Sequence, residues 1–216
     1  MTSMRQGPLV TSADEPLLLD SYLGEYDMAE VHACIVNGDV KTTWEEIRNA
    51  DLSSIPVVHL LLVLRSLPGR LRAISSGQAA PAPPPFSLGD MPRVGFQLLG
   101  ERPAEIAFGF VGKPWKVGAE QPLAIGRDDF AAFSDPGYAK VAFSIRAKPY
   151  GTHRTLITTE TRTATTDAAS SRRFAAYWKL IGPFSALIRR LILRQVTSHV
   201  ETPTATTRRG GDGEWG

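Results

Sequence analysis

The sequence predicts an α+β domain in which an antiparallel sheet curls around a long C-terminal helix. Between residues 93 and 165, polar and apolar residues alternate with a period of two and are interrupted by turn sequences, a pattern typical of short-connected strands. Residues 168–200 repeat instead with helical periodicity. With 216 residues, 43% of them hydrophobic, the chain can bury one sizeable core.

The chain divides into one domain and two terminal segments. Residues 17–201 carry the periodic patterns, whereas residues 1–16 and 202–216 have compositions typical of disordered tails. Within the domain, the proline-rich stretch 75–92 is expected to form a loop, which could be a lid or a linker. A second loosely ordered stretch is expected at 118–127.

The first half of the domain is expected to run strand, helix, helix. Residues 28–36 are rich in β-branched and small residues, and Asn37–Asp39 interrupts that strand. Asp39 can cap a short helix. A second helix is predicted over 56–67, because Pro56 suits a first turn and Pro68–Gly69 would end it. The first of these helices has an apolar face formed by Val40, Trp44 and Ile47.

The second half is expected to be an antiparallel meander. Turn sequences at 101–104, 134–137 and 149–151 separate its segments. One side of the strand 138–148 is apolar and the other mostly polar, which predicts a sheet with one buried face. The predicted strands are 93–100, 105–113, 128–133, 138–148 and 154–165.

The C-terminal helix is predicted to begin after Asp167, which can cap it, and to run for about thirty residues. Gly182–Pro183 is expected to kink it. The apolar stripe consists of Phe174, Tyr177, Trp178, Ile181, Ile188 and Ile192, and the cations Arg172, Lys179, Arg190 and Arg194 fall on the opposite side. Residues 168–200 hold six Arg and Lys and no acid.

This order of elements resembles the helix-grip fold of the START-like superfamily (SRPBCC), which includes polyketide cyclases and lipid-transfer domains. The resemblance spans about residues 22–200 and is similar to a bacterial branch of that superfamily. It is carried by Glu25–Asp27, Val40–Ile47, Gly109–Trp115, Asp135–Lys140, Thr158–Arg162 and Arg173–Arg190. One departure is Gly38–Asp39, where the family usually has Ala-Pro.

The resemblance implies a mainly apolar cavity between the sheet and the C-terminal helix. Its candidate lining residues are Trp44, Phe108, Phe110, Trp115, Phe143, Tyr177 and Trp178, although any one of these aromatics is more often a core residue. Arg146 and Glu160 are the candidate polar contacts to a ligand. Arg146, Glu160 and Arg162 lie on neighbouring predicted strands, either as a buried carboxylate between guanidinium groups or, as is commoner, as solvent-exposed ion pairs.

The sequence gives no catalytic signal. Cys34 is the only cysteine, which excludes an internal disulfide. His32 and Cys34 lie two residues apart, but an orienting group and an oxyanion site cannot be identified, so they are interpreted as a packing pair. The histidines lack metal-ligand spacing, and no phosphate-binding loop is present, so we expect no metal and no cofactor.

The leading functional hypothesis is a carrier or sensor that binds a lipid-like or polyketide-like small molecule. One alternative is a cyclase or aromatase that uses Glu160 or Arg146 for proton transfer in the same cavity. Another assigns contact with an anionic membrane surface or a protein partner to the basic face of the C-terminal helix. Nucleic-acid binding is not expected, because the helix aromatics fall on the opposite side. A cytoplasmic location is expected, since neither a signal sequence nor a transmembrane span is apparent.

Overall fold

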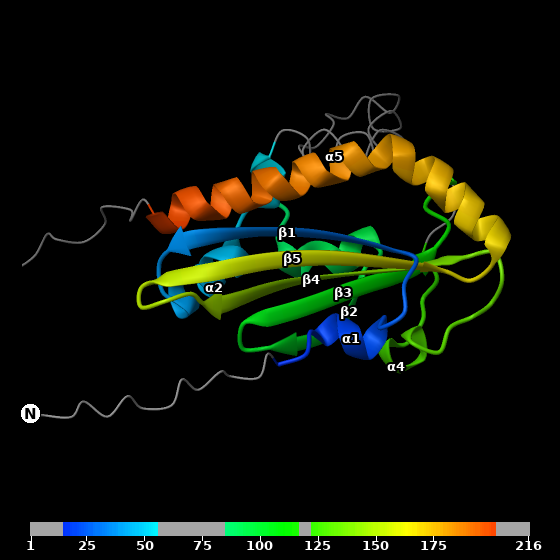
Figure 1. The fold of residues 1–216 in the computed structure, drawn as a ribbon, viewed down its shortest axis with the longest axis horizontal. Helices are drawn as coiled ribbons and strands as arrows, with labels where there is room; N and C mark the ends of the chain where they lie inside the picture. Colours follow the sequence, from blue (N-terminus) through cyan, green and yellow to red (C-terminus); the bar gives the residue numbers. More distant parts are fainter. Residues whose placement is uncertain (1–14, 56–84, 117–121, 202–216) are drawn as a thin grey trace, which may run out of the picture.

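The computed structural model describes residues 15–55, 85–116 and 122–201, which form an antiparallel sheet with helices on both faces (Figure 1). The curved open sheet has the strand order β1-β5-β4-β3-β2, and α5 crosses one face, so the α+β fold class with a helix-grip arrangement is confirmed. The strands are β1 (Met28–Asn37), β2 (Gln97–Arg102), β3 (Glu105–Gly112), β4 (Ala139–Pro149) and β5 (Arg154–Thr165). The α-helices are α1 (Leu18–Tyr22), α2 (Val40–Asn49), α4 (Arg127–Phe130) and α5 (Ala168–Glu201).

The face of the sheet that α5 crosses, called here the helix face, carries the larger hydrophobic core. Side chains from β3, β4 and β5 meet α2 and the C-terminal half of α5 there. Two short 3-10 helices, η1 (Leu52–Ser54) and η2 (Leu88–Val94), complete this layer. Its buried members include Val36, Trp44, Ile47, Leu52, Leu88, Ile106, Phe108, Ile157 and Val196.

The early strand and helix form as expected. β1 covers the predicted 28–36, and the carboxylate of Asp39 caps α2 by accepting a hydrogen bond from the Thr42 amide at 3.0 Å. Trp44 and Ile47 of α2 are buried in the helix-face core. The predicted helix 56–67 and most of the proline-rich stretch 75–92 lie outside the described residues, but residues 88–92 belong to η2 rather than to a loop.

Two predicted strands are corrected by the structure. The strand expected at 93–100 begins at Gln97, because the preceding residues form η2. The segment 128–133 contains the short helix α4 instead of a strand. Asp128 and Asp129 occupy its first turn, where acids interact favourably with the helix dipole, and Phe130 is fully buried. The favourable interaction of these two acids with the helix dipole therefore outweighed the weak polar–apolar alternation that had predicted a strand.

The prediction of one buried face is wrong, because the second face, called here the outer face, is also covered. Ser144 and Arg146 lie on the polar side of β4, which was expected to face solvent, yet they are only 1% and 8% exposed. α1, which was not predicted from the sequence, packs against β2, β3 and β4, and α4 contacts β2. A Cβ on Gly109 would lie 3.0 Å from the ring of Phe130, so this glycine makes room for α4.

α5 begins where the sequence predicted. The carboxylate of Asp167 accepts hydrogen bonds from the Ser170 amide (2.9 Å) and hydroxyl (2.8 Å), and from the amides of Gly137 and Ala169 (2.8 Å). These bonds hold the pKa of Asp167 down at about 2. The helix bends along its length, and Pro183 lies inside it, where it removes one backbone hydrogen bond (Figure 1).

Candidate functional site

A cavity of about 420 Å³ lies between the helix face of the sheet and α5. η2 and its neighbours form one wall, strands β4 and β5 the floor, and α5 the opposite wall. Fourteen of the seventeen lining side chains are apolar, and the other three are Thr159, Ser185 and Arg189. The apolar ones are Ile47, Leu52, Phe86, Leu88, Met91, Val94, Phe96, Phe143, Ile145, Ile157, Ile188, Ile192, Leu193 and Val196.

Phenylalanine rings shape the sheet side of this cavity. Phe96 and Phe143 line it, with ring centroids 5.4 Å apart in an edge-to-face arrangement. Phe108 stacks on Phe143 at 5.5 Å, and Phe110 meets Phe96 edge-on at 4.9 Å. Of the predicted ring residues on the sheet, Phe143 therefore reaches the cavity, while Phe108 and Phe110 pack against the lining rings.

Arg189 supplies a charged group to the cavity wall. It donates from Nη2 to the Thr161 hydroxyl at 2.7 Å and from Nη1 to the Glu30 carboxylate. His32 hydrogen-bonds to the other oxygen of Glu30 at 2.7 Å. All of these groups project from β1, β5 and α5 into the helix-face layer, and the side chains of Arg189, Glu30 and His32 are 16%, 19% and 15% exposed.

Glu30 compensates the charge of Arg189. Burial lowers the pKa of Arg189, whereas the neighbouring carboxylate opposes that change, and the guanidinium stays protonated at neutral pH. Arg189 was not among the predicted site residues, although its position in the helical pattern is informative. Arg189 lies four residues after Ser185 and three before Ile192, which places a cation on the sheet-facing side of α5.

The remaining predicted aromatic residues lie away from the cavity lining. Trp44 packs in the helix-face core. Tyr177 and Trp178 surround Phe174 on the first half of α5, with centroid distances of 5.9 Å and 5.7 Å. Trp115 follows β3, and its buried indole N–H has no hydrogen-bond partner among the described residues.

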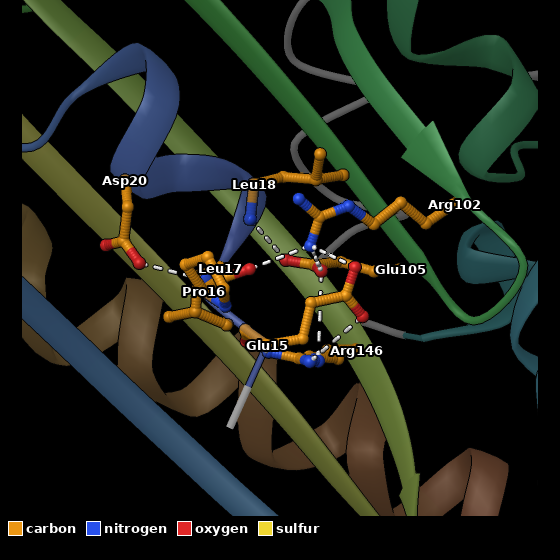
Figure 2. A network of polar contacts seen from close by, with 8 residues as sticks. All are labelled: Glu15, Pro16, Leu17, Leu18, Asp20, Arg102, Glu105 and Arg146. Carbon is orange, nitrogen blue, oxygen red and sulfur yellow. Dashed lines mark hydrogen bonds and ion pairs between the residues drawn. The ribbon is translucent and has the colours of Figure 1, made fainter. Parts of the chain in front are cut away.

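The two predicted polar contacts, Arg146 and Glu160, lie on the outer face, separated from the cavity by the sheet. Arg146 is placed opposite Glu105 of β3, whose carboxylate lies 3.8 Å from the Arg146 guanidinium and 3.4 Å from that of Arg102 (Figure 2). Glu105 is 2% exposed and also accepts the Leu18 amide at 2.8 Å. Arg146 donates to the Glu15 carbonyl at 2.8 Å.

Glu160 pairs with Arg162 rather than with Arg146. The Arg162 Nε donates to Glu160 at 2.6 Å, while its other nitrogens reach the Asp20 carboxylate at 2.8 Å and the Leu23 carbonyl at 3.1 Å. Burial opposes the charge of Arg162, but Glu160 and Asp20 together raise its pKa. Glu160 and Arg162 are 8% and 6% exposed, so the expectation of solvent-exposed pairs was wrong. Both outer-face networks tie residues 15–23 to the sheet.

The environment of Cys34 does not activate a thiol. Its sulfur lies 3.8 Å from the Thr197 hydroxyl, and burial raises the pKa of the thiol, which disfavours the nucleophilic thiolate. His32 is engaged with Glu30. His32 and Cys34 therefore make separate contacts, the one with Glu30 and the other with Thr197.

Comparisons with known proteins leave the function open. A scan of protein-family models and a search of curated proteins gave no match to this sequence. A conserved protein from Geobacillus kaustophilus aligns with 10% identity over 80% of this chain and 95% of its own, at a TM-score of 0.39. A hypothetical protein from Helicobacter pylori aligns with 12% identity over 93% of this chain and 99% of its own, at a TM-score of 0.34. These scores are too low to support a conclusion about fold or activity.

Proposed function

We propose that this chain binds a hydrophobic small molecule in the cavity between the sheet and α5, as a carrier or a sensor. The observation that carries this proposal is the composition of the cavity wall. The cavity volume of about 420 Å³ is within the range of roughly 300–1,000 Å³ found for small-molecule sites. Fourteen apolar lining side chains favour a ligand that is mostly hydrocarbon.

Arg189 and Thr159 support a ligand with one polar end. Arg189 lines the cavity while Glu30 and Thr161 hold its guanidinium in place. A ligand oxygen at this wall could accept a hydrogen bond from the Arg189 guanidinium. The Glu30 carboxylate balances the charge of Arg189, so the site would carry no net positive charge. The ligand class that fits is an amphipath with a long apolar body and one hydrogen-bond acceptor, as in a lipid-like or polyketide-like compound.

The same wall favours binding over catalysis. Among the described lining residues, Arg189 is the ionisable one, and a guanidinium stays protonated at neutral pH, which makes it a poor general acid or base. Glu160 and Arg146, the residues that a cyclase hypothesis would use, lie across the sheet from the cavity. A carrier or sensor needs no proton transfer.

The test is to fill the cavity without charging it. Ser185→Trp on α5 and Val94→Trp on η2 each place an indole in the cavity from opposite walls. Ser198→Trp is the matched control, since Ser198 is exposed on the same helix and does not line the cavity. Binding is measured by titration with a fluorescent long-chain fatty acid, and folding by circular dichroism and melting temperature.

Wild type and Ser198→Trp should bind the probe, whereas both cavity variants should bind it at least about tenfold more weakly while keeping the far-UV spectrum. A tenfold change corresponds to about 1.4 kcal/mol, less than the loss expected when several buried methylenes of the probe are excluded. Equal binding by all four proteins would contradict the proposal, because the probe would then be bound outside the cavity. Absence of binding by wild type would also count against it.

A further inference from the structure

α5 exposes apolar side chains on the side that faces away from the sheet. Leu180, Phe184 and Leu187 are 69%, 55% and 43% exposed, which are large fractions for residues of this type. Their spacing of four and three residues places them on one side of the helix. Pro183, between them, is also exposed. Together these four residues are called here the α5 stripe.

Cations surround the α5 stripe. Lys179 precedes it, Arg190 and Arg194 follow it at helical spacing, and all three are exposed. Arg172 and Arg173 add two further exposed cations about two turns towards the start of the helix. Residues 168–200 contain no acid, so nothing within this stretch of helix offsets the positive charge.

We propose that the α5 stripe docks the protein onto an anionic lipid surface, with α5 lying in the plane of the membrane. Exposed apolar side chains would enter the boundary between headgroups and acyl chains, while the flanking cations would contact lipid phosphates. This is surface contact, because no helix among the described residues is long and apolar enough to cross a bilayer.

The chemistry of the α5 stripe favours a membrane over two other occupants. Nucleic acid would be recognised by the cations alone, leaving Leu180 and Leu187 without a role. A second copy of the chain would have to bring the same surface against itself in a twofold contact, which would place the cations of one helix against those of the other. An anionic lipid surface can bury the apolar residues and, through its phosphates, contact the cations.

This docking is independent of the cavity. The cavity-lining residues of α5, among them Ile188, Arg189 and Ile192, face the sheet, whereas the α5 stripe faces away from it. A filled cavity should therefore leave membrane binding unchanged. Ser185→Trp tests this separation, since it removes space from the cavity while retaining Leu180, Phe184, Arg190 and Arg194.

The experiment is co-sedimentation of the full chain with vesicles of phosphatidylcholine, or of phosphatidylcholine mixed with phosphatidylglycerol. The protein should bind the mixed vesicles and not the neutral ones. Raising the ionic strength from about 0.1 M to about 1 M shortens the Debye length from about 10 Å to about 3 Å, and binding should fall accordingly.

Two double variants separate the contributions of charge and apolar surface. Arg190→Glu with Arg194→Glu, and Leu180→Ser with Phe184→Ser, should each weaken binding to the mixed vesicles by at least about tenfold. The controls are Arg127→Glu on α4 and Val31→Ser on β1, which change an exposed cation and an exposed apolar residue outside α5. Both controls and Ser185→Trp should bind as wild type does, and melting temperatures verify that every variant is folded.

Three results would overturn the proposal. The first is absence of binding to mixed vesicles by the folded wild type. The second is binding that Leu180→Ser with Phe184→Ser does not weaken, together with equal competition by duplex DNA, which would indicate a nucleic-acid surface. The third is a dimer in light scattering that the same double variant dissociates, because the α5 stripe would then be covered by a second copy of the chain.

Discussion

Removing the carboxylate of Glu105 should destabilise the domain strongly, because three groups on the outer face depend on it. Glu105 is 2% exposed and accepts a hydrogen bond from the Leu18 amide at 2.8 Å. Its carboxylate lies 3.4 Å from the Arg102 guanidinium and 3.8 Å from that of Arg146. In Glu105→Leu, the buried Leu18 amide would lose its acceptor, at a cost of about 1–3 kcal/mol. Breaking a buried ion pair by removing one partner costs about 3–5 kcal/mol.

These two costs overlap, and Arg146 keeps its hydrogen bond to the Glu15 carbonyl. We therefore expect Glu105→Leu to lower the free energy of unfolding by about 3 kcal/mol. For a domain of this size, that loss corresponds to a fall in melting temperature of roughly 6–12 °C. Glu105→Gln should cost less, because its amide oxygen can still accept the Leu18 amide.

Urea unfolding followed by circular dichroism measures this effect, with Glu101→Leu as the matched control. Glu101 is a glutamate of the neighbouring strand whose partner Arg48 is half exposed, so its loss should cost less than about 1 kcal/mol. Hydrogen exchange should also show faster exchange of the Leu18 amide in Glu105→Leu. A loss below about 1 kcal/mol in Glu105→Leu would refute the inference that this network holds α1 to the sheet.

Three further predictions concern single positions. The pKa of Asp167 is about 2 in the folded state, below the value of about 3.9 for an unperturbed aspartate, so its stabilising effect is present above pH 4 and is lost as the pH falls towards 2. Wild type should therefore have a higher melting temperature than Asp167→Asn at pH 6, and the difference should shrink as the pH falls through 2 and vanish below it; a constant difference would contradict the assignment. Gly109→Ala would place a Cβ 2.8 Å from Leu99 and 3.0 Å from the Phe130 ring, and should cost about 1–3 kcal/mol in urea unfolding, whereas a neutral effect would mean that α4 moves freely. The raised pKa of Cys34 predicts slower alkylation by iodoacetamide at neutral pH in the native than in the urea-unfolded protein, and faster native alkylation would indicate an activated thiol.

The long, strongly periodic segments could be predicted from the sequence. β4, β5 and α5 follow the predicted strands and helix closely, because their periodicity extends over ten or more residues and Asp167 marks where α5 begins. The early pair of β1 and α2 was also predictable, with Asp39 as the cap. α4 was not, since its four residues are too few to show a helical period.

Burial of the outer face depends on contacts between distant parts of the chain. Glu105 accepts a hydrogen bond from the Leu18 amide, 87 residues away in the sequence, and Arg162 donates one to the Leu23 carbonyl, 139 residues away. A strand with polar residues on one side is expected from its sequence to expose that side to solvent. Here, however, those residues form hydrogen bonds and ion pairs beneath α1. For the same reason, the sequence could indicate that Arg146 and Glu160 take part in ion pairs, but it could not identify Glu105 as the partner of Arg146 or assign these pairs to a face.

The lining of the cavity was only partly predictable. Phe143 could be predicted from the alternation along β4, and Ile188 and Ile192 from the apolar, sheet-facing side of the predicted C-terminal helix. All three line the cavity. The wall formed by η2, including Leu88 and Met91, was not, because the proline-rich composition around it indicated a loop. Which aromatic rings face the cavity depends on how neighbouring rings stack, and the sequence does not contain that information.

The central claim, that the cavity beneath α5 holds a hydrophobic ligand, is tested most directly by native mass spectrometry of the purified chain, with extraction and identification of any retained compound. The account predicts an added mass from a hydrophobic compound with one polar end, retained by wild type and by Ser198→Trp and absent from folded Ser185→Trp. An apo mass for wild type, together with an unchanged melting temperature across a panel of lipids and polyketides, would contradict it.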